Sequence, residues 1–257
     1  MSIKVGSNSL VKQSHKLNMA SFKLSSLAMD IIYVMISQLT KEDKDFKIYE
    51  VSIRDLENKL GKRVDTRYLK KAVKDVMSNP IGIKSPDGSF CYIAWVSLFK
   101  FDAGTRTVSF RFDSELKPLL LEVKKNFVLS QLKEISSLQS EYAKRIYNIL
   151  KQWENNLTFK IKVHNLQDML QVPKSLLVYS NFKMKVLKVA VDQINKNTSL
   201  KVSYKEEKDG RRVDGLTFVI KRSEVIKKKE GSSKGVNALE EWLKEDSPSD
   251  IIDTEVI

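Results

Sequence analysis

The side chains of this sequence best suited to chemistry are cations, and the chemistry that they suit is binding to phosphates. They gather on residues 180 to 198, which have the sequence SNFKMKVLKVAVDQINKNT. At about 100° per residue, one side of a helix over these residues holds Leu187, Ala190, Val191 and Ile194, and the other holds Asn181, Lys185, Lys188, Asp192 and Lys196. The pattern predicts a helix with one buried face and one cationic face.

A basic hairpin is predicted directly after this helix. In residues 200 to 220, apolar side chains alternate with polar ones on both sides of a turn at residues 208 to 211. A helix fits the major groove of DNA, and a hairpin beside it reaches the flanking phosphates. Together they are typical of a winged helix-turn-helix, so the sequence predicts DNA binding.

Cations of this hairpin and of an earlier helix are candidate phosphate contacts. Those of the hairpin are Lys201, Lys205, Lys208, Arg211 and Arg212. Those of the earlier helix are Arg67, Lys70, Lys71 and Lys74. Each phosphate that such a cation neutralises steepens the salt dependence of binding. The alternative in both places is an ordinary solvated surface, but we favour contact, above all at the hairpin tip beside the predicted helix.

The residues that could carry catalysis are too scattered to predict an enzyme. The only histidines, His15 and His164, are 149 residues apart, so the paired-histidine metal site of a nicking enzyme is not expected. Tyr142 and Tyr147 are then predicted to pack inside the protein rather than to act as nucleophiles. No GxxxxGK[ST] phosphate loop occurs, which argues against an ATPase or a helicase. We expect no catalytic residue, no metal and no cofactor.

The length and the charge distribution predict two domains and a polyanionic partner. A chain of 257 residues can form two separate cores. Its formal net charge is +13, but residues 236 to 257 hold seven acidic side chains and one lysine, which leaves +19 on residues 1 to 235. Cys91 is the single cysteine, residues 1 to 18 are too polar for a signal peptide, and no apolar stretch is long enough to span a membrane. We therefore expect a cytoplasmic protein without a disulfide or a membrane partner.

The first half of the chain is predicted to form a winged-helix domain. Leu27, Ile31, Ile32, Met35 and Leu39 recur at helical spacing. A strand over residues 46 to 51, a short helix capped by Ser52 and a basic helix over residues 65 to 78 are expected to follow. Alternation over residues 90 to 101 and 106 to 112 then predicts one long hairpin.

The second half repeats this order. Ser136 and Gln139 resemble a capping box for a helix with Leu138 and Trp153 on its apolar face. Arg145 in this helix is expected to pair with Glu141, with DNA contact as the alternative. A strand over residues 158 to 163 and a short helix to about residue 170 lead to the basic helix and hairpin described above.

The two halves can be superimposed on one another in sequence. Residues 51 to 60 match residues 161 to 170 at an offset of 110, and residues 69 to 73 match residues 187 to 191 at an offset of 118. Two unrelated amphipathic helices could align as well as this, but the apolar positions and the element order agree together. We therefore predict an α+β fold of two tandem winged-helix domains in pseudo-repeat.

The predicted domain limits follow from this repeat. The first domain covers residues 20 to 128, and the second, with the main recognition helix, covers residues 129 to 225. Residues 1 to 19 are polar and lack periodicity, so they are predicted to form a flexible arm. Residues 226 to 257 lead through a lysine run and a Gly-Ser linker to an acidic tail. The sequence leaves open whether this tail is a partner-binding helix or disordered.

Three segments carry a family resemblance: NSLVKQSHKLNMASFKLSSLAMDIIYVMISQL, SLQSEYAKRIYNILKQW and NFKMKVLKVAVDQINKNTSLKVSYKEEKDGRRVDGLTFVI. They resemble, in this order, the opening, the first helix of the second domain, and the recognition helix with its wing in the iteron-binding plasmid replication initiators of the RepE and pi type. The resemblance covers about residues 10 to 222. It implies a bacterial, plasmid-encoded initiator with two winged-helix domains and no enzymatic activity.

The family implies particular partners and DNA-reading residues. Its members bind directly repeated origin sites (iterons) as monomers, repress their own promoter as dimers through the first domain, and recruit the host initiator and helicase. The positions that match its reading residues are Asn181, Lys183, Lys185 and Lys188. Members of the family often carry arginines at residues 183 to 185, and lysine lacks the fork suited to guanine, which favours phosphate contact here. Asn181 suits either an adenine or the cap of the helix.

Two alternatives to an initiator stay open at this point. A dedicated transcriptional repressor would share the winged-helix fold but would need neither repeated sites nor replication partners. A nicking enzyme is less favoured because the paired histidines are missing.

Overall fold

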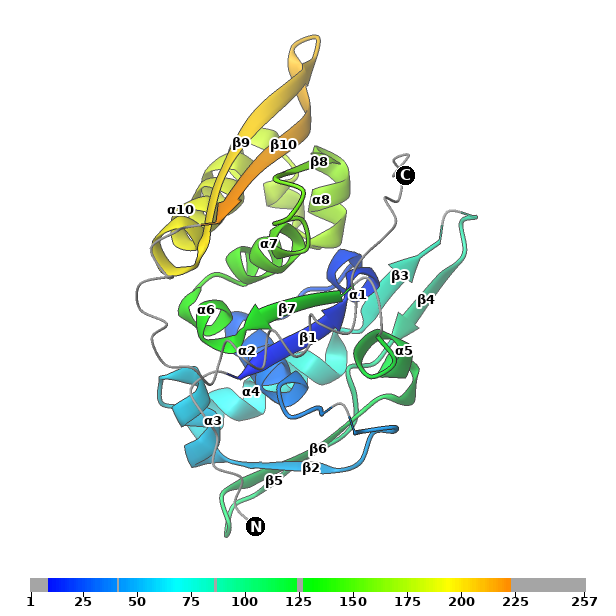
Figure 1. The fold of residues 1–257 in the computed structure, drawn as a ribbon, viewed down its shortest axis with the longest axis vertical. Helices are drawn as coiled ribbons and strands as arrows, with labels where there is room; N and C mark the ends of the chain where they lie inside the picture. Colours follow the sequence, from blue (N-terminus) through cyan, green and yellow to red (C-terminus); the bar gives the residue numbers. More distant parts are fainter. Residues whose placement is uncertain (1–8, 41, 86, 124–126, 223–257) are drawn as a thin grey trace.

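Two winged-helix domains follow one another along the chain, and each holds a three-stranded antiparallel sheet (Figure 1). The computed structural model describes residues 9–40, 42–85, 87–123 and 127–222. The α+β fold predicted from the sequence is confirmed, since helices and strands mix in both halves in the same order.

The first domain has the predicted order of helix, strand, two helices and hairpin. Its elements are α2 (Ser26–Ile36), β2 (Tyr49–Ser52), α3 (Ile53–Leu60), α4 (Thr66–Ser78), β5 (Val96–Asp102) and β6 (Thr107–Phe112). The strands lie in the order β2-β6-β5. Ser52 caps α3 as predicted, because its Oγ accepts from the backbone N–H of Asp55 at 3.0 Å. Gly61 ends the helix in the left-handed region, at φ 66°.

The second domain repeats this topology. Its elements are α7 (Glu141–Lys151), β8 (Thr158–Lys162), α8 (Val163–Met169), α9 (Tyr179–Phe182), the π-helical segment η3 (Lys183–Leu187), α10 (Lys188–Asn197), β9 (Leu200–Asp209) and β10 (Arg212–Arg222). Its strands lie in the order β8-β10-β9, which matches the order in the first domain. The residues paired by the offset of 118 are buried in both copies: Leu69, Ala72 and Val76 in one, and Leu187, Ala190 and Ile194 in the other. The predicted pseudo-repeat is therefore confirmed.

The N-terminal residues differ from the prediction of a flexible arm. Residues 10 to 14 form β1 (Leu10–Ser14), and α1 (His15–Met19) follows, with Val11 and Leu17 fully buried. β1 pairs with β7 (Phe127–Gln131), and Figure 1 shows these two strands lying side by side between the domains. The predicted domain boundary at residues 128 and 129 thus falls inside a paired strand. The pairing was missed because its two strands are far apart in the sequence. Residues 1–8 and the predicted tail lie outside the described residues.

Two further local predictions need correction. The long alternating run at residues 90 to 101 is two strands, because β4 (Phe90–Ile93) turns back onto β3 (Ile81–Lys84) before β5 begins. The capping box was placed one turn too early. Ser140 is the N-cap of α7, where its Oγ accepts from Ala143, whereas Leu138 precedes the helix. The remaining short elements are η1 (Ser114–Leu116), α5 (Lys117–Leu120) and α6 (Leu132–Ser137).

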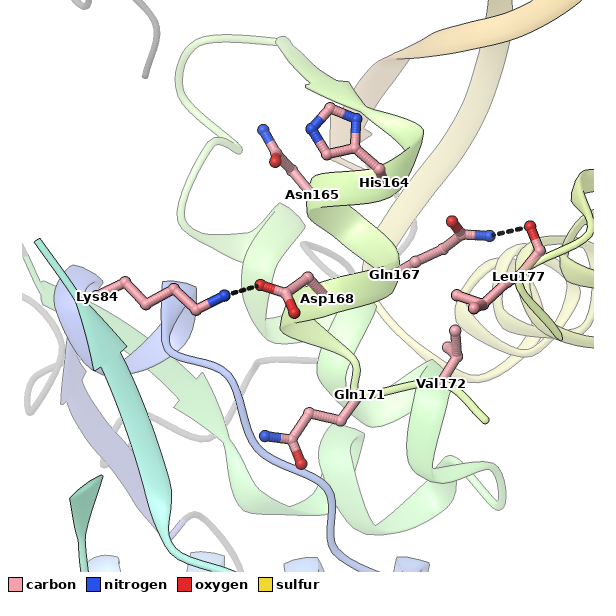
Figure 2. Close-up of a pocket in the computed structure, with 8 residues that line it drawn as sticks. All are labelled: Lys84, His164, Asn165, Gln167, Asp168, Gln171, Val172 and Leu177. Carbon is pink, nitrogen blue, oxygen red and sulfur yellow. Dashed lines mark hydrogen bonds and ion pairs between the residues drawn. The ribbon is translucent and has the colours of Figure 1, made fainter. Parts of the chain in front are cut away.

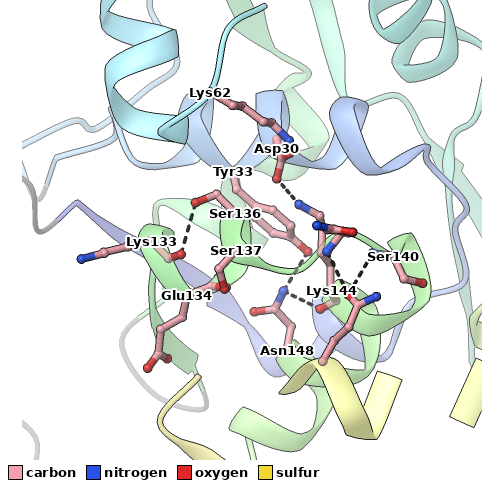
Figure 3. A network of polar contacts seen from close by, with 12 residues as sticks. Asp30, Tyr33, Lys62, Lys133, Glu134, Ser136, Ser137, Ser140, Lys144 and Asn148 are labelled. Carbon is pink, nitrogen blue, oxygen red and sulfur yellow. Dashed lines mark hydrogen bonds and ion pairs between the residues drawn. The ribbon is translucent and has the colours of Figure 1, made fainter. Parts of the chain in front are cut away.

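Helix α7 joins the domains through a cluster of polar side chains, all buried except Lys62, which we name the interdomain seam. The seam consists of Asp30 and Lys62 of the first domain and Lys144, Arg145 and Asn148 of α7. Figure 3 shows Asp30 of α2 held between the ammonium groups of Lys144 and Lys62. The side chains of Asp30 and Lys144 are 0% exposed, and Lys62 Nζ lies 2.5 Å from Asp30 Oδ2. Asn148 Nδ2 donates to the Tyr33 hydroxyl at 2.9 Å. The domains therefore meet through specific directional bonds.

Arg145 belongs to the seam, so the predicted pair with Glu141 is wrong. Its Nη2 donates to the backbone carbonyl of Ala20 at 2.6 Å, and its guanidinium lies 3.6 Å from the centre of the Phe22 ring. Burial lowers the pKa of Arg145 to about 10, so the group remains charged near neutral pH. The physical reason for the error is that this face of α7 packs against the first domain, where a buried guanidinium finds a carbonyl and an aromatic ring.

The seam generates a stability prediction. We expect Asp30→Ala to lower the free energy of unfolding by about 3 to 5 kcal/mol, because the buried Lys144 ammonium loses its counter-charge. The matched control is Asp168→Ala, which breaks an exposed interdomain pair with Lys84 and is expected to cost up to about 1 kcal/mol. Urea unfolding of both variants measures the difference. Equal losses would contradict the role of the seam.

Candidate nucleic-acid interface

One continuous helical rod, made of α9, η3 and α10, carries the predicted recognition residues. Of the predicted apolar face, Leu187, Ala190 and Ile194 are buried and Val191 is half-buried, and Phe182 and Val186 extend the buried side toward the start of the rod. The π-helical segment inserts a wider turn, a feature that often occurs at functional sites. The turn before the rod contains η2 (Lys174–Leu176).

The outward side of the rod is cationic. Lys185, Lys188 and Lys196 are exposed, as predicted. Asn181 is exposed but does not cap the helix, whose N-cap is Val178. Its Nδ2 instead donates to the Ser175 carbonyl at 3.0 Å. The amide oxygen and the second N–H of Asn181 are left for another partner.

Lys183 is placed differently from its neighbours. Its Nζ lies 2.7 Å from Glu206 Oε1 on β9, and its side chain is 44% exposed. The Tyr179 hydroxyl donates to the same carboxylate oxygen at 2.8 Å. We name Tyr179, Lys183 and Glu206 the Glu206 clamp. The clamp joins the start of the recognition helix to the wing, and its acid was not among the predicted site residues.

The wing is the hairpin β9–β10, which projects beyond the body of the second domain (Figure 1). It turns at Gly210, whose φ of 58° suits glycine. Arg211 and Arg212 are exposed at the tip, as predicted. Alternation along β9 divides the predicted lysines, because neighbouring residues of a strand point to opposite faces. Lys208 shares the face of Glu206, whereas Lys205 lies on the opposite face.

Two acids of the wing are paired with lysines of strand β8. Glu207 lies 3.5 Å from Lys160 Nζ, and Asp214 pairs with Lys162. Lys201 is exposed, and its ammonium donates to the backbone carbonyl of Asn195 near the end of α10. The predicted wing lysines therefore do not form one surface, and Lys208 with the tip arginines is best placed beside the recognition helix.

In the first domain, α4 presents the second predicted cationic face. Lys70, Lys71 and Lys74 are exposed along it. Arg67 is also exposed, and its guanidinium forms two bonds with Asp65 at 3.2 and 2.9 Å. Because Asp65 is the N-cap of α4, this pair fixes Arg67 at the start of the helix.

A cleft of about 490 Å³ lies between β3 and α8 and reaches Leu177 in the turn before the rod (Figure 2). Lys84 and Asp168 pair across it at 2.6 Å. Gln167 of α8 donates to the carbonyls of Leu176 and Leu177, both at 3.1 Å. These bonds fix the turn that leads into the recognition helix.

The sequence predicts neither a metal site nor a membrane span. In the parts of the chain that the structure describes, no three histidine, cysteine, aspartate or glutamate side chains are grouped to hold a metal ion. Nor does any described helix combine the length and apolarity that a membrane span requires.

Tyr147 is fully buried and donates to Glu134, and Tyr142 is half-buried, as predicted for packed residues.

Two family models together match most of the residues that the structure describes. The model described as "Initiator Replication protein, WH1" matches residues 10–151, and that described as "Initiator Rep protein, WH2" matches residues 162–220. The chain belongs to the family of initiator replication proteins. The resemblance inferred from the sequence is therefore confirmed, and both winged-helix domains are accounted for.

Individual relatives agree with this assignment. A "Probable replication protein rep" of Bifidobacterium longum (strain NCC 2705) is 23% identical over 223 residues, which cover 84% of this chain and 74% of that protein. Among solved structures, the "Crystal structure of Pi initiator protein in complex with iteron DNA" has a TM-score of 0.71 at 19% identity. The match covers 86% of this chain and all of that one, and it supports the two-domain fold.

The exposed wing tip generates a binding prediction for this initiator. Replacement of Arg211 and Arg212 by alanine is expected to weaken binding to any DNA duplex. The slope of log K against log salt should become shallower by about 0.9 for each phosphate that the variant no longer neutralises. Filter binding or fluorescence anisotropy over a salt series measures the slope.

A control variant removes one exposed cation elsewhere. Lys47→Ala in the first domain removes a lysine that pairs with Asp43, and it should leave the slope unchanged. A slope that the wing variant does not alter would contradict the phosphate contacts of the tip.

Proposed function

We propose that this initiator of the Rep family binds directly repeated origin sequences and opens the adjacent duplex. The observation that carries the proposal is the rod of α9, η3 and α10, with exposed Lys185 and Lys188 beside a wing that ends in two exposed arginines. The family membership and the fold shared with a protein solved on iteron DNA support it.

In this proposal the rod enters the major groove. Asn181, Lys185 and Lys188 lie toward the base edges or the adjoining phosphates, and Lys196 extends the contact along the backbone. The wing binds flanking phosphates through Lys208, Arg211 and Arg212, with Lys201 and Lys205 as the outer cations. In the first domain Arg67, Lys70, Lys71 and Lys74 contact a second stretch of the same DNA. Lys183 has a separate role, proposed below.

Origin opening would come from binding energy and DNA deformation, without nucleotide hydrolysis by this chain. We further propose that the protein acts in the cytoplasm of a plasmid-bearing bacterium. There it would exchange between a monomer on the repeats and a homodimer, joined through the first domain, that represses its own promoter. Recruitment of the host initiator and helicase completes the proposal. It needs no enzymatic step, cofactor or metal.

Footprinting of the purified protein on the origin region of its own plasmid tests the proposal. We expect several evenly spaced protections on direct repeats, each weakening steeply between about 50 and 200 mM salt, because many phosphates are contacted. A single protected inverted repeat over a promoter would favour a dedicated repressor instead. No protected sequence at all would overturn site-specific binding, and strand cleavage during the assay would favour a nicking enzyme.

A further inference from the structure

An acidic side chain sits where the recognition helix meets the wing. Glu206 holds both Tyr179 and Lys183, at 2.8 and 2.7 Å, close to the exposed cations of the rod and the wing. An acid weakens the attraction of a surface for a polyanion. Its presence at this place therefore calls for a role other than direct contact with DNA. The Lys183 ammonium lowers the pKa of the Glu206 carboxyl, which keeps the acid ionised and the pair charged.

We propose that Glu206 is a specificity-determining residue that withholds Lys183 from the phosphates of non-specific DNA and fixes the wing against the recognition helix. The inference rests on the proposed DNA-binding function and adds a role for a residue that makes no favourable contact with DNA itself. Two separate effects of the clamp support it.

The first effect is electrostatic. Non-specific binding derives almost entirely from phosphate neutralisation, so each additional mobile lysine strengthens binding to every sequence alike. Lys183 stands one turn after Tyr179 on the rod and is held toward β9 by the carboxylate. Its charge is thereby neutralised within the protein, and the rod keeps Lys185 and Lys188 as its exposed cations near that end.

The second effect is geometric. A specific complex requires the rod in the groove and the wing tip on the flanking phosphates at the same time. The clamp ties the two elements with an ion pair and a hydroxyl hydrogen bond to one carboxylate, and both are charge-assisted because the acid is ionised. The clamp therefore stabilises the arrangement in which the rod and the wing contact DNA together. Only the correct DNA site makes all the contacts that this arrangement offers.

The neighbouring residue Glu207 provides a matched control. It lies on the opposite face of β9, where it contacts Thr217 and Lys160 on strands β10 and β8. Glu206→Gln and Glu207→Gln each remove one negative charge from the same strand. The first variant releases Lys183 on the recognition helix, whereas the second frees Lys160 on β8 and leaves the clamp intact.

The experiment compares the dissociation constants of full-length variants on a repeat duplex and on a scrambled duplex of equal composition, across a salt series. We expect Glu206→Gln to bind the scrambled duplex roughly fivefold to tenfold more tightly at low salt, with a slope steeper by about 0.9, and to lose preference for the repeat. Glu207→Gln should change neither the slope nor the preference by as much.

The Lys183→Gln variant distinguishes two explanations of the Glu206→Gln result. One is the release of Lys183, and the other is the loss of an acid that repels DNA. Alone, Lys183→Gln should leave the slope of the wild-type protein unchanged, and in the Glu206→Gln background it should restore that slope. Tyr179→Phe keeps the charge and removes one bond of the clamp, so it should lower preference for the repeat without changing the slope. Thermal unfolding confirms that each variant is folded.

Two outcomes would overturn the inference. One is equal behaviour of Glu206→Gln and Glu207→Gln. The other is a shallower slope for Lys183→Gln in the wild-type background, which would show that Lys183 already contacts phosphate. A wild-type protein with no preference for the repeat would instead refute the proposed function, while the slopes on the scrambled duplex would still decide whether Glu206 withholds Lys183.

Discussion

The buried pairing of Asp30 with Lys144 is the interaction on which the arrangement of the two domains depends. Removing two charges from water is costly, and it is tolerated only where the partners are close and their remaining bonding groups are satisfied. Lys62 supplies the second partner of Asp30, and Arg145 and Asn148 add directional bonds to the first domain. An apolar contact would allow the domains to slide, whereas these bonds specify one orientation.

This fixed junction determines how the cationic surfaces are positioned. The rod of the second domain is anchored on α7 and on Gln167 of α8, and the wing is tied to the rod through the Glu206 clamp. The rod and the wing are thus held on α7, the helix that carries three residues of the interdomain seam. A surface held in this way can present two helices and a hairpin to one DNA molecule with little loss of entropy on binding.

The sequence predicted the features that depend on local periodicity. The helical spacing of Leu187, Ala190 and Ile194, and its counterpart in the first domain, placed both basic helices because an amphipathic helix must bury its apolar side. The seam was not predictable in this way, since the buried Lys144 and Asn148 find their partners Asp30 and Tyr33 more than 100 residues away in the sequence. Alternation along β9 places Glu206 and Lys208 on one face, but the proximity of Glu206 to Lys183 depends on tertiary packing. The role of each cation in DNA binding stays a prediction.

The most direct test of a rigid two-domain reader is hydroxyl-radical footprinting on a single repeat, before and after insertion of about five base pairs between the segments that the two domains protect. Such an insertion rotates one segment by about half a helical turn relative to the other. Because the seam fixes the domains, we predict that the insertion abolishes protection of one segment and weakens binding. Protection of both segments at the new spacing, or of one segment alone before insertion, would contradict this account.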